Sequence, residues 1–544
     1  MPTIRSFTER AAAWPRRALA LFVALALLSG MPALAEMAPA SADSFAQEAQ
    51  QYLVDHGLVA EADLTVGYLA SADGEINPIH CNERDMVSLN QLVFESLVDL
   101  DETQKPVPLL ADSWTVEGNV WTFRLRQGVQ FHNGMECLAQ DVVASYEALL
   151  AAGNSNPYAA RLSLIEDMVA SDAYTVRVLA RYSGMITLYA MTFPVMERST
   201  LNNTLPRGTG PYWYISYIPG VTVRLERNPL WWKQQPYIES VVGLCYYSTG
   251  EALEALQTGE IDAFSTRSYT AAFNRRLSSV MTTDYSTASY ELLVPNLSAS
   301  SPMSDQRVRQ AVMYAIDRAT LVSNAYLEMA QQSEVPIVPG TWLYESQSAV
   351  YYYSPERALQ LLNEAGWTSL TSPAKLSRIG EDGLIEDLSI RIVTYTDDIS
   401  SVRTNAAEQI AANLRAVGVQ VTVLSGSIDQ VTDAIADGRY DLALVGVNLS
   451  EVPNLRPLLT GDGALNFSGA TSAEMDALLA RTFTAATEEE MIDAYSDLQM
   501  FIVERLPFLG LVFRTGSVLS TRSLAGLSGT RETDVYNGLE FVEK

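Results

Sequence analysis

The chain has 544 residues, with 64 Asp and Glu against 36 Lys and Arg, and its formal net charge is −28 at pH 7. Such an excess of negative charge repels phosphate backbones and anionic lipid, which excludes nucleic acid as a partner. The three cysteines, Cys81, Cys137 and Cys245, are too few for a disulfide scaffold. One bridge beside one thiol, or three buried thiols, both stay open.

The start of the chain has the three parts of a secretory signal peptide. Arginines precede an apolar run from Ala18 to Leu28, and Ala33-Leu34-Ala35 offers small residues where a signal peptidase reads. We predict a signal peptide over residues 1–35, a mature chain that begins at Glu36, and export to the periplasm or the extracellular face. An uncleaved anchor is the alternative. No cysteine near the cleavage region offers a lipid attachment site, and residues 36–60 are predicted as a linker or helical arm.

The globular pattern begins with a strand over "LTVGYLA", residues 64–70. Helical spacing of Leu92, Val93 and Leu97 predicts a helix within residues 90–100. In "VWTFRLRQGVQF" apolar and polar residues alternate, which predicts a half-buried strand.

The segment "RGTGPYWYISYIPGVTVRLERNPLWW" starts like a dinucleotide-binding loop. The third glycine of that fingerprint is missing, because Trp213 stands in its place and no helix pattern follows. Two runs of aromatic and β-branched residues are instead separated by Pro219-Gly220. We therefore predict a β-hairpin that Gly208 and Gly210 introduce, with no phosphate site.

The second half alternates strands with helices. Ser354 and Pro355 are typical of a helix start, and Leu359, Leu362 and Ala365 are predicted to form its buried face. Strands over "LSIRIVTYT", "VQVTVL" and "YDLALVGV" alternate with two helices, and the last strand is apolar enough to lie inside a sheet. A capping box at 487–490 begins a further helix that ends before Pro507. This order predicts a mainly parallel, mixed sheet.

No motif of hydrolases, metalloproteases or phosphate-binding loops occurs, and the chain has only three histidines, His56, His80 and His132. His80 and Cys81 form a soft-ligand pair without an evident third ligand, so we interpret them as a loop pair. Ser372 and Lys375 match a Ser-x-x-Lys spacing by chance. No catalytic residue, metal site or cofactor is predicted.

Seven segments in one order resemble the dipeptide- and oligopeptide-binding family of extracytoplasmic solute-binding proteins of ABC importers. They are "LADSWTVEGNVWTFRLRQGVQFHNGMECLAQDVVASYEAL", the "GTGPYWYISYIPGVTVRLERNPLWW" hairpin, "EALEALQTGEIDAF", "VRQAVMYAIDRATLV", "YYSPERALQLLNEAGW", "NFSGATSAEMDALL" and "QMFIVERLPFLGL". The resemblance covers about residues 63–520.

The resemblance implies an α/β, two-lobed periplasmic-binding-protein-like fold with mixed sheets, a hinge and an additional domain. Lobe I is expected over 61–82, 204–294 and 508–544, the additional domain over 83–203, and lobe II over 295–507. His132 falls in a scaffold block and is expected to be structural.

The function that the resemblance implies is capture of a small peptide or peptide-like ligand between two closing lobes, and delivery to the permease subunits of an ABC importer. It implies a monomer without enzymatic activity. A nickel or haem complex or an oligosaccharide could replace the peptide on the same fold. Two further functions stay open, namely a secreted hydrolase and a chemosensory subunit that binds without delivery.

Loops at strand ends predict the ligand-binding residues. These are Asn82, Glu83 and Arg84 after the first strand, Ser265, Thr266 and Arg267 after "GEIDAF", and Asn448, Ser450 and Glu451 after "YDLALVGV". Arg84 or Arg267 is expected to face the carboxylate of a zwitterionic ligand, and Glu451 its ammonium.

One departure from the family pattern concerns this last loop. Peptide binders of the family carry "W-x-x-D-Y-x-x-P", whose Asp holds the α-amino group of the peptide. Here Val447 stands in the place of the Trp and Ser450 in the place of the Asp. Glu451 could supply the carboxylate one position further along.

Overall fold

The computed structural model describes residues 63–372, 375–380, 383–396 and 401–543. The predicted signal peptide and linker, residues 1–35 and 36–60, lie outside this range. Within it, no helix is both long and apolar enough to cross a membrane.

One large mixed sheet runs through the molecule. Its eleven strands have the order β18-β17-β19-β12-β20-β11-β1-β10-β9-β8, and β13 pairs with β20 beside this path. The strands are β1 (Leu64–Leu69), β8 (Tyr212–Ile218), β9 (Thr222–Arg227), β10 (Ser240–Tyr246), β11 (Ala263–Thr266), β12 (Met281–Pro295), β13 (Ala330–Gln332), β17 (Ser389–Tyr395), β18 (Gln420–Gly426), β19 (Leu442–Asn448) and β20 (Leu509–Ser520).

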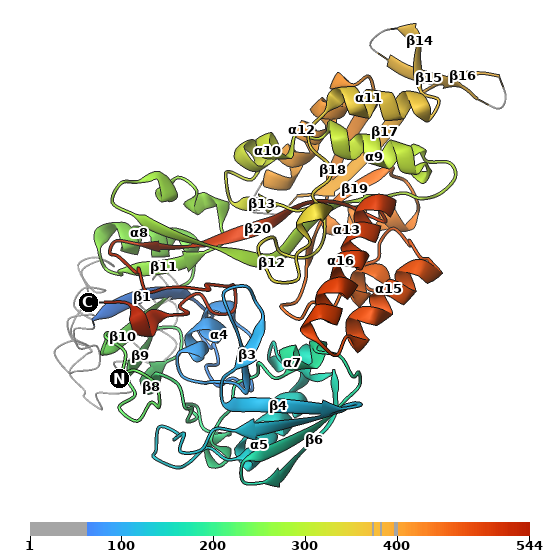
Figure 1. Cartoon of the computed structure of the whole chain (residues 1–544). Coiled ribbons are helices and arrows are strands. Elements are labelled where there is room, and N and C mark those ends of the chain that lie inside the picture. The colour runs from blue at the N-terminus through green and yellow to red at the C-terminus, as the bar shows by residue number, and fades with distance from the viewer. Residues whose placement is uncertain (1–62, 373–374, 381–382, 397–400, 544) are drawn as a thin grey trace, which may run out of the picture.

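The long strands β12 and β20 pair antiparallel and join the two ends of this sheet (Figure 1). The last part of β20 also pairs with β11, whereas the last part of β12 pairs with β19. We call the end with β1 and β8–β11 the first lobe. The end with β17–β19, together with the helices within residues 306–505, is the second lobe. The predicted α/β, two-lobed mixed fold is therefore confirmed.

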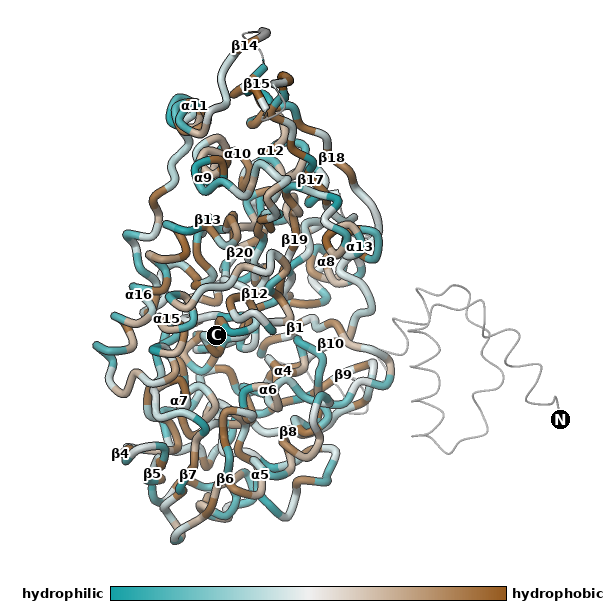
Figure 2. Tube along the Cα trace, turned by 90° about the vertical axis from the view of Figure 1, so that its right-hand side faces the viewer, coloured by the Kyte–Doolittle hydropathy of each residue, from teal (hydrophilic) through white to brown (hydrophobic). Residues whose placement is uncertain are grey.

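A separate sheet, the four-stranded unit, has the order β4-β5-β7-β6 and lies beside the first lobe (Figure 1). Its strands are β4 (Ala111–Glu117), β5 (Val120–Leu125), β6 (Ile165–Asp172) and β7 (Thr175–Ala180). In β5 the side chains of Trp121, Phe123 and Leu125 are buried and those between them are not, as the alternation predicts. Figure 2 shows this unit at one end of the molecule and β14 at the other.

The remaining elements are helices and two short sheets, β2-β3 and β14-β15-β16. The helices are α4 (Arg84–Gln91), α5 (Ala139–Ala151), α6 (Ala159–Leu162), α7 (Ile186–Ala190), α8 (Thr249–Thr258), α9 (Gln306–Ala315), α10 (Arg318–Thr320), α11 (Pro355–Glu364), α12 (Val402–Ala416), α13 (Ile428–Ala436), α14 (Arg456–Leu459), α15 (Ala473–Thr484) and α16 (Glu488–Arg505). The short strands are β2 (Val98–Leu100), β3 (Pro106–Pro108), β14 (Thr368–Ser372), β15 (Lys375–Ile379) and β16 (Ile385–Asp387).

The predicted helix starts in the second lobe are confirmed. The Ser354 hydroxyl accepts a hydrogen bond from the backbone N–H of Arg357 at the start of α11, and Thr487 forms the expected capping box with Glu490 in α16. Of the predicted buried face of α11 only Leu362 is confirmed, because Ala365 is the C-cap beyond the helix and is half-buried. The buried face is formed by Ala358, Leu361 and Leu362, because Leu359 faces solvent with 39% of its surface exposed.

The helix predicted within residues 90–100 is wrong. Helix α4 ends at Gln91, ahead of the apolar run. The carbonyl oxygens of Leu92 and Val93 accept hydrogen bonds from the N–H groups of Tyr212 and Gly210, both at 3.0 Å. The hairpin therefore takes the acceptors that a continuing helix would need.

The predicted hairpin is confirmed: β8 and β9 pair antiparallel, and Gly220 in the turn has φ +67°. Gly208 lies so close to the chain before β2 that a Cβ atom there would clash with the carbonyl oxygen of Val93. His132 is buried beside it and its Nδ1 accepts a hydrogen bond from the Gly208 N–H at 3.2 Å. Burial lowers the pKa of His132 to about 3, so the ring stays neutral.

The structure distinguishes between one disulfide with one thiol and three buried thiols. All three cysteines lie among the described residues, all are buried, and no disulfide joins any two of them.

We expect Gly208→Ala to destabilise the protein by about 3 kcal/mol, because the backbone of Val93 cannot move away from the added methyl group. Gly250→Ala in α8 is the matched control, since its only neighbour within 4 Å would be Ser248 Oγ at 3.9 Å. Thermal unfolding of both variants measures the difference. Equal stability of the two variants would contradict the prediction.

Candidate functional site

A cavity of about 550 Å³ lies between the two lobes. Its wall is formed by short segments from distant parts of the chain, within residues 82–87, 157–161, 286–288, 336–343, 448–455 and 531–533. Its lining therefore combines both lobes, the middle of β12, and the segment after β20.

The position of the cavity follows from strand direction. In the first lobe β1 pairs parallel with β11, and in the second lobe β17 pairs parallel with β19. The carboxyl ends of parallel strands meet at one edge of a sheet, so the loops that follow them gather there. Arg267 follows β11 directly, Asn448 is the last residue of β19, and the loop to Glu451 follows it.

The cavity brings together six of the nine predicted site residues. They are Asn82, Arg84, Arg267, Asn448, Ser450 and Glu451. That these six contact a ligand stays a prediction.

The other three, Glu83, Ser265 and Thr266, are not among the residues that line the cavity. Glu83 accepts hydrogen bonds from the backbone N–H of Ser71 and so bends back toward β1. Ser265 and Thr266 still belong to β11 and are 2% and 1% exposed, because β11 continues to pair with β20 to its last residue.

Two arginines of the cavity wall, Arg84 and Arg267, each have a carboxylate partner. Arg84 Nε donates to Asp85 Oδ1 at 2.7 Å, and Arg267 forms an ion pair with Glu532. The other oxygen of Glu532 accepts the Ala288 N–H at 2.9 Å. Burial lowers the pKa of Arg267, Glu532 opposes this effect, and the positive charge of Arg84 adds to it. The two guanidinium groups thus lie close enough to interact.

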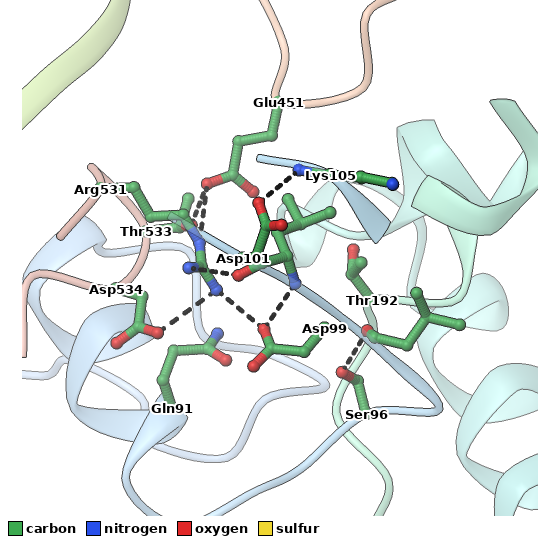
Figure 3. A network of polar contacts seen from close by, with 12 residues as sticks. Gln91, Ser96, Asp99, Asp101, Lys105, Thr192, Glu451, Arg531, Thr533 and Asp534 are labelled. Carbon is green, nitrogen blue, oxygen red and sulfur yellow. Dashed lines mark hydrogen bonds and ion pairs between the residues drawn. The ribbon is translucent and has the colours of Figure 1, made fainter. Parts of the chain in front are cut away.

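Glu451 reaches from the second lobe to the segment after β20, as Figure 3 shows, and also to α6. Its Oε2 pairs with Arg161 Nη2 at 3.2 Å, and Arg161 belongs to α6, in the segment between β5 and β6. Its Oε1 accepts a hydrogen bond from the Thr533 hydroxyl and lies 3.9 Å from Arg531 Nε. Both carboxylate oxygens therefore have protein partners, and the contacts join the lobes across the cavity.

Arg531 is the centre of a buried group of charges that Figure 3 shows from close by. Its Nη2 lies 3.2 Å from Asp99 Oδ1 and 3.3 Å from Asp534 Oδ2. Burial raises the pKa of Asp534 to about 7, although Arg531 opposes this effect. The nearby charges of Asp99, Glu540 and Glu451 raise that pKa further.

One side of the cavity is apolar. Trp342 and Leu343 line it together with Ile337, Val338 and Phe513. The Trp342 indole N–H donates to the hydroxyl of Tyr189 at 2.8 Å, and its backbone N–H donates to the carbonyl of Thr103 at 3.0 Å. This wall is thereby fixed to the chain around α7 and β2.

The two family positions that differ have structural roles. Val447 is buried within β19 at 4% exposure. The Ser450 hydroxyl accepts the backbone N–H of Val452 at 3.1 Å and so stabilises the turn of the loop.

Sequence reasoning missed Arg161, Trp342 and the segment from Arg531 to Thr533. The run Arg531-Glu532-Thr533-Asp534 was a usable signal, since it places three charged residues within four positions near the end of the chain. Arg161 and Trp342 gave no local signal, because only tertiary contacts bring them to the cavity.

The soft-ligand pair of His80 and Cys81 lies in a turn that follows Asn77. His80 is exposed and Cys81 is buried, and both backbone N–H groups bond to the carbonyl of Asn77. In the part of the chain that the structure covers, no group of three or more His, Cys, Asp or Glu could hold a metal ion.

The pKa of Asp534 gives a pH prediction. A carboxylate whose pKa is raised on folding adds stability below its unfolded pKa of about 4, and this stability is lost as pH rises through about 7. Relative to Asp534→Asn, the free energy of unfolding of the native protein should therefore fall by up to about 4 kcal/mol between pH 4 and pH 8.

Thermal unfolding of both proteins across that range tests this pH prediction. Asp437→Asn, at an exposed carboxylate paired with exposed Arg439, is the control and should follow the native profile. A constant difference between the native protein and Asp534→Asn at every pH would refute the assignment.

The comparisons with known proteins agree with this geometry. A family model described as bacterial extracellular solute-binding proteins, family 5 middle, matches residues 105–463. The oligopeptide-binding protein AppA of Bacillus subtilis (strain 168) is 22% identical over 514 residues, which cover 87% of this chain and 90% of AppA. The nickel-binding periplasmic protein of Escherichia coli (strain K12) is 25% identical over 404 residues, or 68% of this chain and 72% of that protein.

Among solved structures, the nickel ABC transporter of Bacillus halodurans superposes with a TM-score of 0.74 at 21% identity. The alignment covers 88% of this chain and 99% of that one, which shows a shared fold. Because the family model alone spans more than half of the sequence, the chain belongs to family 5 of the bacterial extracellular solute-binding proteins.

Proposed function

We propose that this protein captures a small peptide-like solute between its two lobes and delivers it to the permease subunits of an ABC importer. The observation that carries the proposal is the cavity itself, which both lobes line at the ends of their parallel strands. Closure of two lobes around a solute excludes water and creates a surface that a permease can recognise.

The volume and lining support a ligand of this size. A cavity of about 550 Å³ is within the range of small-molecule sites. Arg84 and Arg267 offer guanidinium groups for a carboxylate, and the wall around Trp342 offers an apolar surface for a side chain. The relative from Bacillus subtilis is named for oligopeptide binding, which favours a peptide.

The domain boundaries expected from the sequence are part of the same proposal. Lobe I takes 61–82, 204–294 and 508–544, the additional domain takes 83–203, and lobe II takes 295–507. The connections support it, because β12 enters and β20 leaves the second lobe within a single sheet. The protein acts as a monomer in this proposal, and binding does not alter the solute chemically.

The relative from Escherichia coli is named for nickel binding, so the ligand must be identified directly. We expect native mass spectrometry of the gently purified protein to release a peptide-like molecule, and incubation of that molecule with the protein to leave it unchanged. The variant Arg267→Gln should retain less of it. Arg276→Gln is the matched control, since Arg276 is exposed, pairs with exposed Glu328 and does not line the cavity.

Recovery of a metal complex, haem or an oligosaccharide would contradict the peptide part of this proposal and leave solute binding standing. Multiple turnovers of the recovered molecule would contradict binding without catalysis.

Export is proposed as well, to the periplasm or the extracellular face. Sequencing of the mature N-terminus from the native host should find Glu36, because Ala33 and Ala35 are the small residues that a signal peptidase needs. A mature protein that starts at Met1 would contradict this prediction.

A further inference from the structure

The cavity is unevenly supplied with charged groups. Four arginines line it, Arg84, Arg161, Arg267 and Arg531, against two carboxylates, Glu451 and Glu532. The lining therefore has a formal charge of +2, in a chain whose net charge is −28. The three other carboxylates of the network, Asp85, Asp99 and Asp534, are not among the residues that line this cavity.

Neither carboxylate of the lining has an oxygen left without a protein partner. Glu451 uses Oε2 for Arg161 and Oε1 for the Thr533 hydroxyl. Glu532 uses Oε1 for Arg267 and Oε2 for the Ala288 N–H at 2.9 Å. Each oxygen keeps one further acceptor site, but a ligand ammonium would compete there with donors that already stabilise the charge, so the gain from binding it is reduced.

Arg84 and Arg267 differ from these carboxylates, because each keeps unused donors. Arg84 contacts Asp85 through Nε and Nη2, and Arg267 contacts Glu532 through Nη1. Within the described part of the chain, Arg84 Nη1 and Arg267 Nε and Nη2 have no hydrogen-bond partner. Both side chains are partly exposed, at 21% and 38%, and both residues line the cavity.

These two arginines lie at the same edge of the sheet, since the Leu69 N–H at the end of β1 donates to Asp85, the neighbour of Arg84. Arg84 begins α4, which follows β1, and Arg267 follows β11, the strand parallel to β1. Two guanidinium groups held near each other disfavour a cation and favour two anionic groups, which they can bind through paired N–H donors. The apolar wall around Trp342 leaves room for an uncharged portion of the same ligand.

We propose that the solute is an acidic peptide-like molecule that presents two carboxylates to Arg84 and Arg267 and places no ammonium on Glu451. Glu451 instead holds the closed arrangement, through Arg161 and Thr533. This inference rests on the proposed function and narrows its ligand to anionic peptides.

Calorimetry with six defined tripeptides tests the inference on the native protein. They are glutamate-alanine-glutamate, trialanine and lysine-alanine-lysine, each with a free and with an acetylated N-terminus. The acidic tripeptide should bind about tenfold or more tighter than trialanine, and trialanine tighter than the basic one. Acetylation should change the affinity of the acidic tripeptide by less than about threefold.

Three outcomes distinguish a failure of the anionic-ligand inference from a failure of the proposed function. Tighter binding of free trialanine than of the acidic peptide would overturn the anionic inference and leave the proposed function intact. A loss of about tenfold or more on acetylation would do the same, since it would show that an ammonium is recognised. Absence of binding by all six peptides would overturn both.

Single substitutions then test whether Arg84 and Arg267 bind the acidic ligand directly. Arg84→Gln and Arg267→Gln should each weaken the acidic tripeptide by about tenfold and trialanine much less, whereas the exposed control Arg276→Gln should change neither. The double variant Arg267→Gln, Glu532→Gln, which keeps the charge balance, should still bind the acidic tripeptide weakly. Restored affinity in that double variant would show that Arg267 only neutralises Glu532, which would contradict direct recognition. Thermal unfolding identifies a variant that misfolds, and the six peptides on the native protein still decide the question.

Discussion

The antiparallel pair of β12 and β20 is the constraint on which the rest of the molecule depends. Both strands pass from one lobe to the other inside a single sheet, so the lobes can move only as far as this pair bends. Pairing shifts between Ser286 and Tyr290, where the chain of β12 is irregular. Such an irregularity bends a strand and increases its twist. Residues 286–288 also line the cavity, so the floor of the site and the point of bending are the same residues.

Each arginine that lines the cavity pairs with a carboxylate, and these ion pairs also restrict how the two lobes can move. An arginine removed from water without a partner would destabilise the fold by several kcal/mol, so the buried arginines need the acidic groups around them. Glu451 contributes to this pairing from the second lobe, and its partners come from the segments that hold Arg161 and Arg531. The free energy of closing the lobes therefore includes these ion pairs, which become stronger as water is excluded.

The sequence predicts the elements better than the contacts between them. Helix α16 and the buried strand β19 follow from a capping box and an apolar run, and the loop to Glu451 follows from the end of β19. The helix expected near Leu92 failed because a distant hairpin takes its acceptors, which no local pattern shows. Arg161 and Arg531 were missed for the same reason. Periodicity identifies the face that an element buries, but not the partner that meets it.

The chain as a whole is acidic, whereas its cavity is lined with arginines, and these two charge distributions act on different steps of solute binding. At physiological ionic strength, charges about 8 Å apart or more are largely screened, so the overall charge of −28 influences an approaching solute mainly at low salt. Inside the cavity the interacting groups are a few ångströms apart and partly desolvated, and screening is much weaker there. The short-range donors of Arg84 and Arg267 thus outweigh the distant negative charge once a solute is bound, although that charge slows the arrival of an anion. Selectivity then depends on the interior of the cavity, and the acidic exterior affects the rate of association.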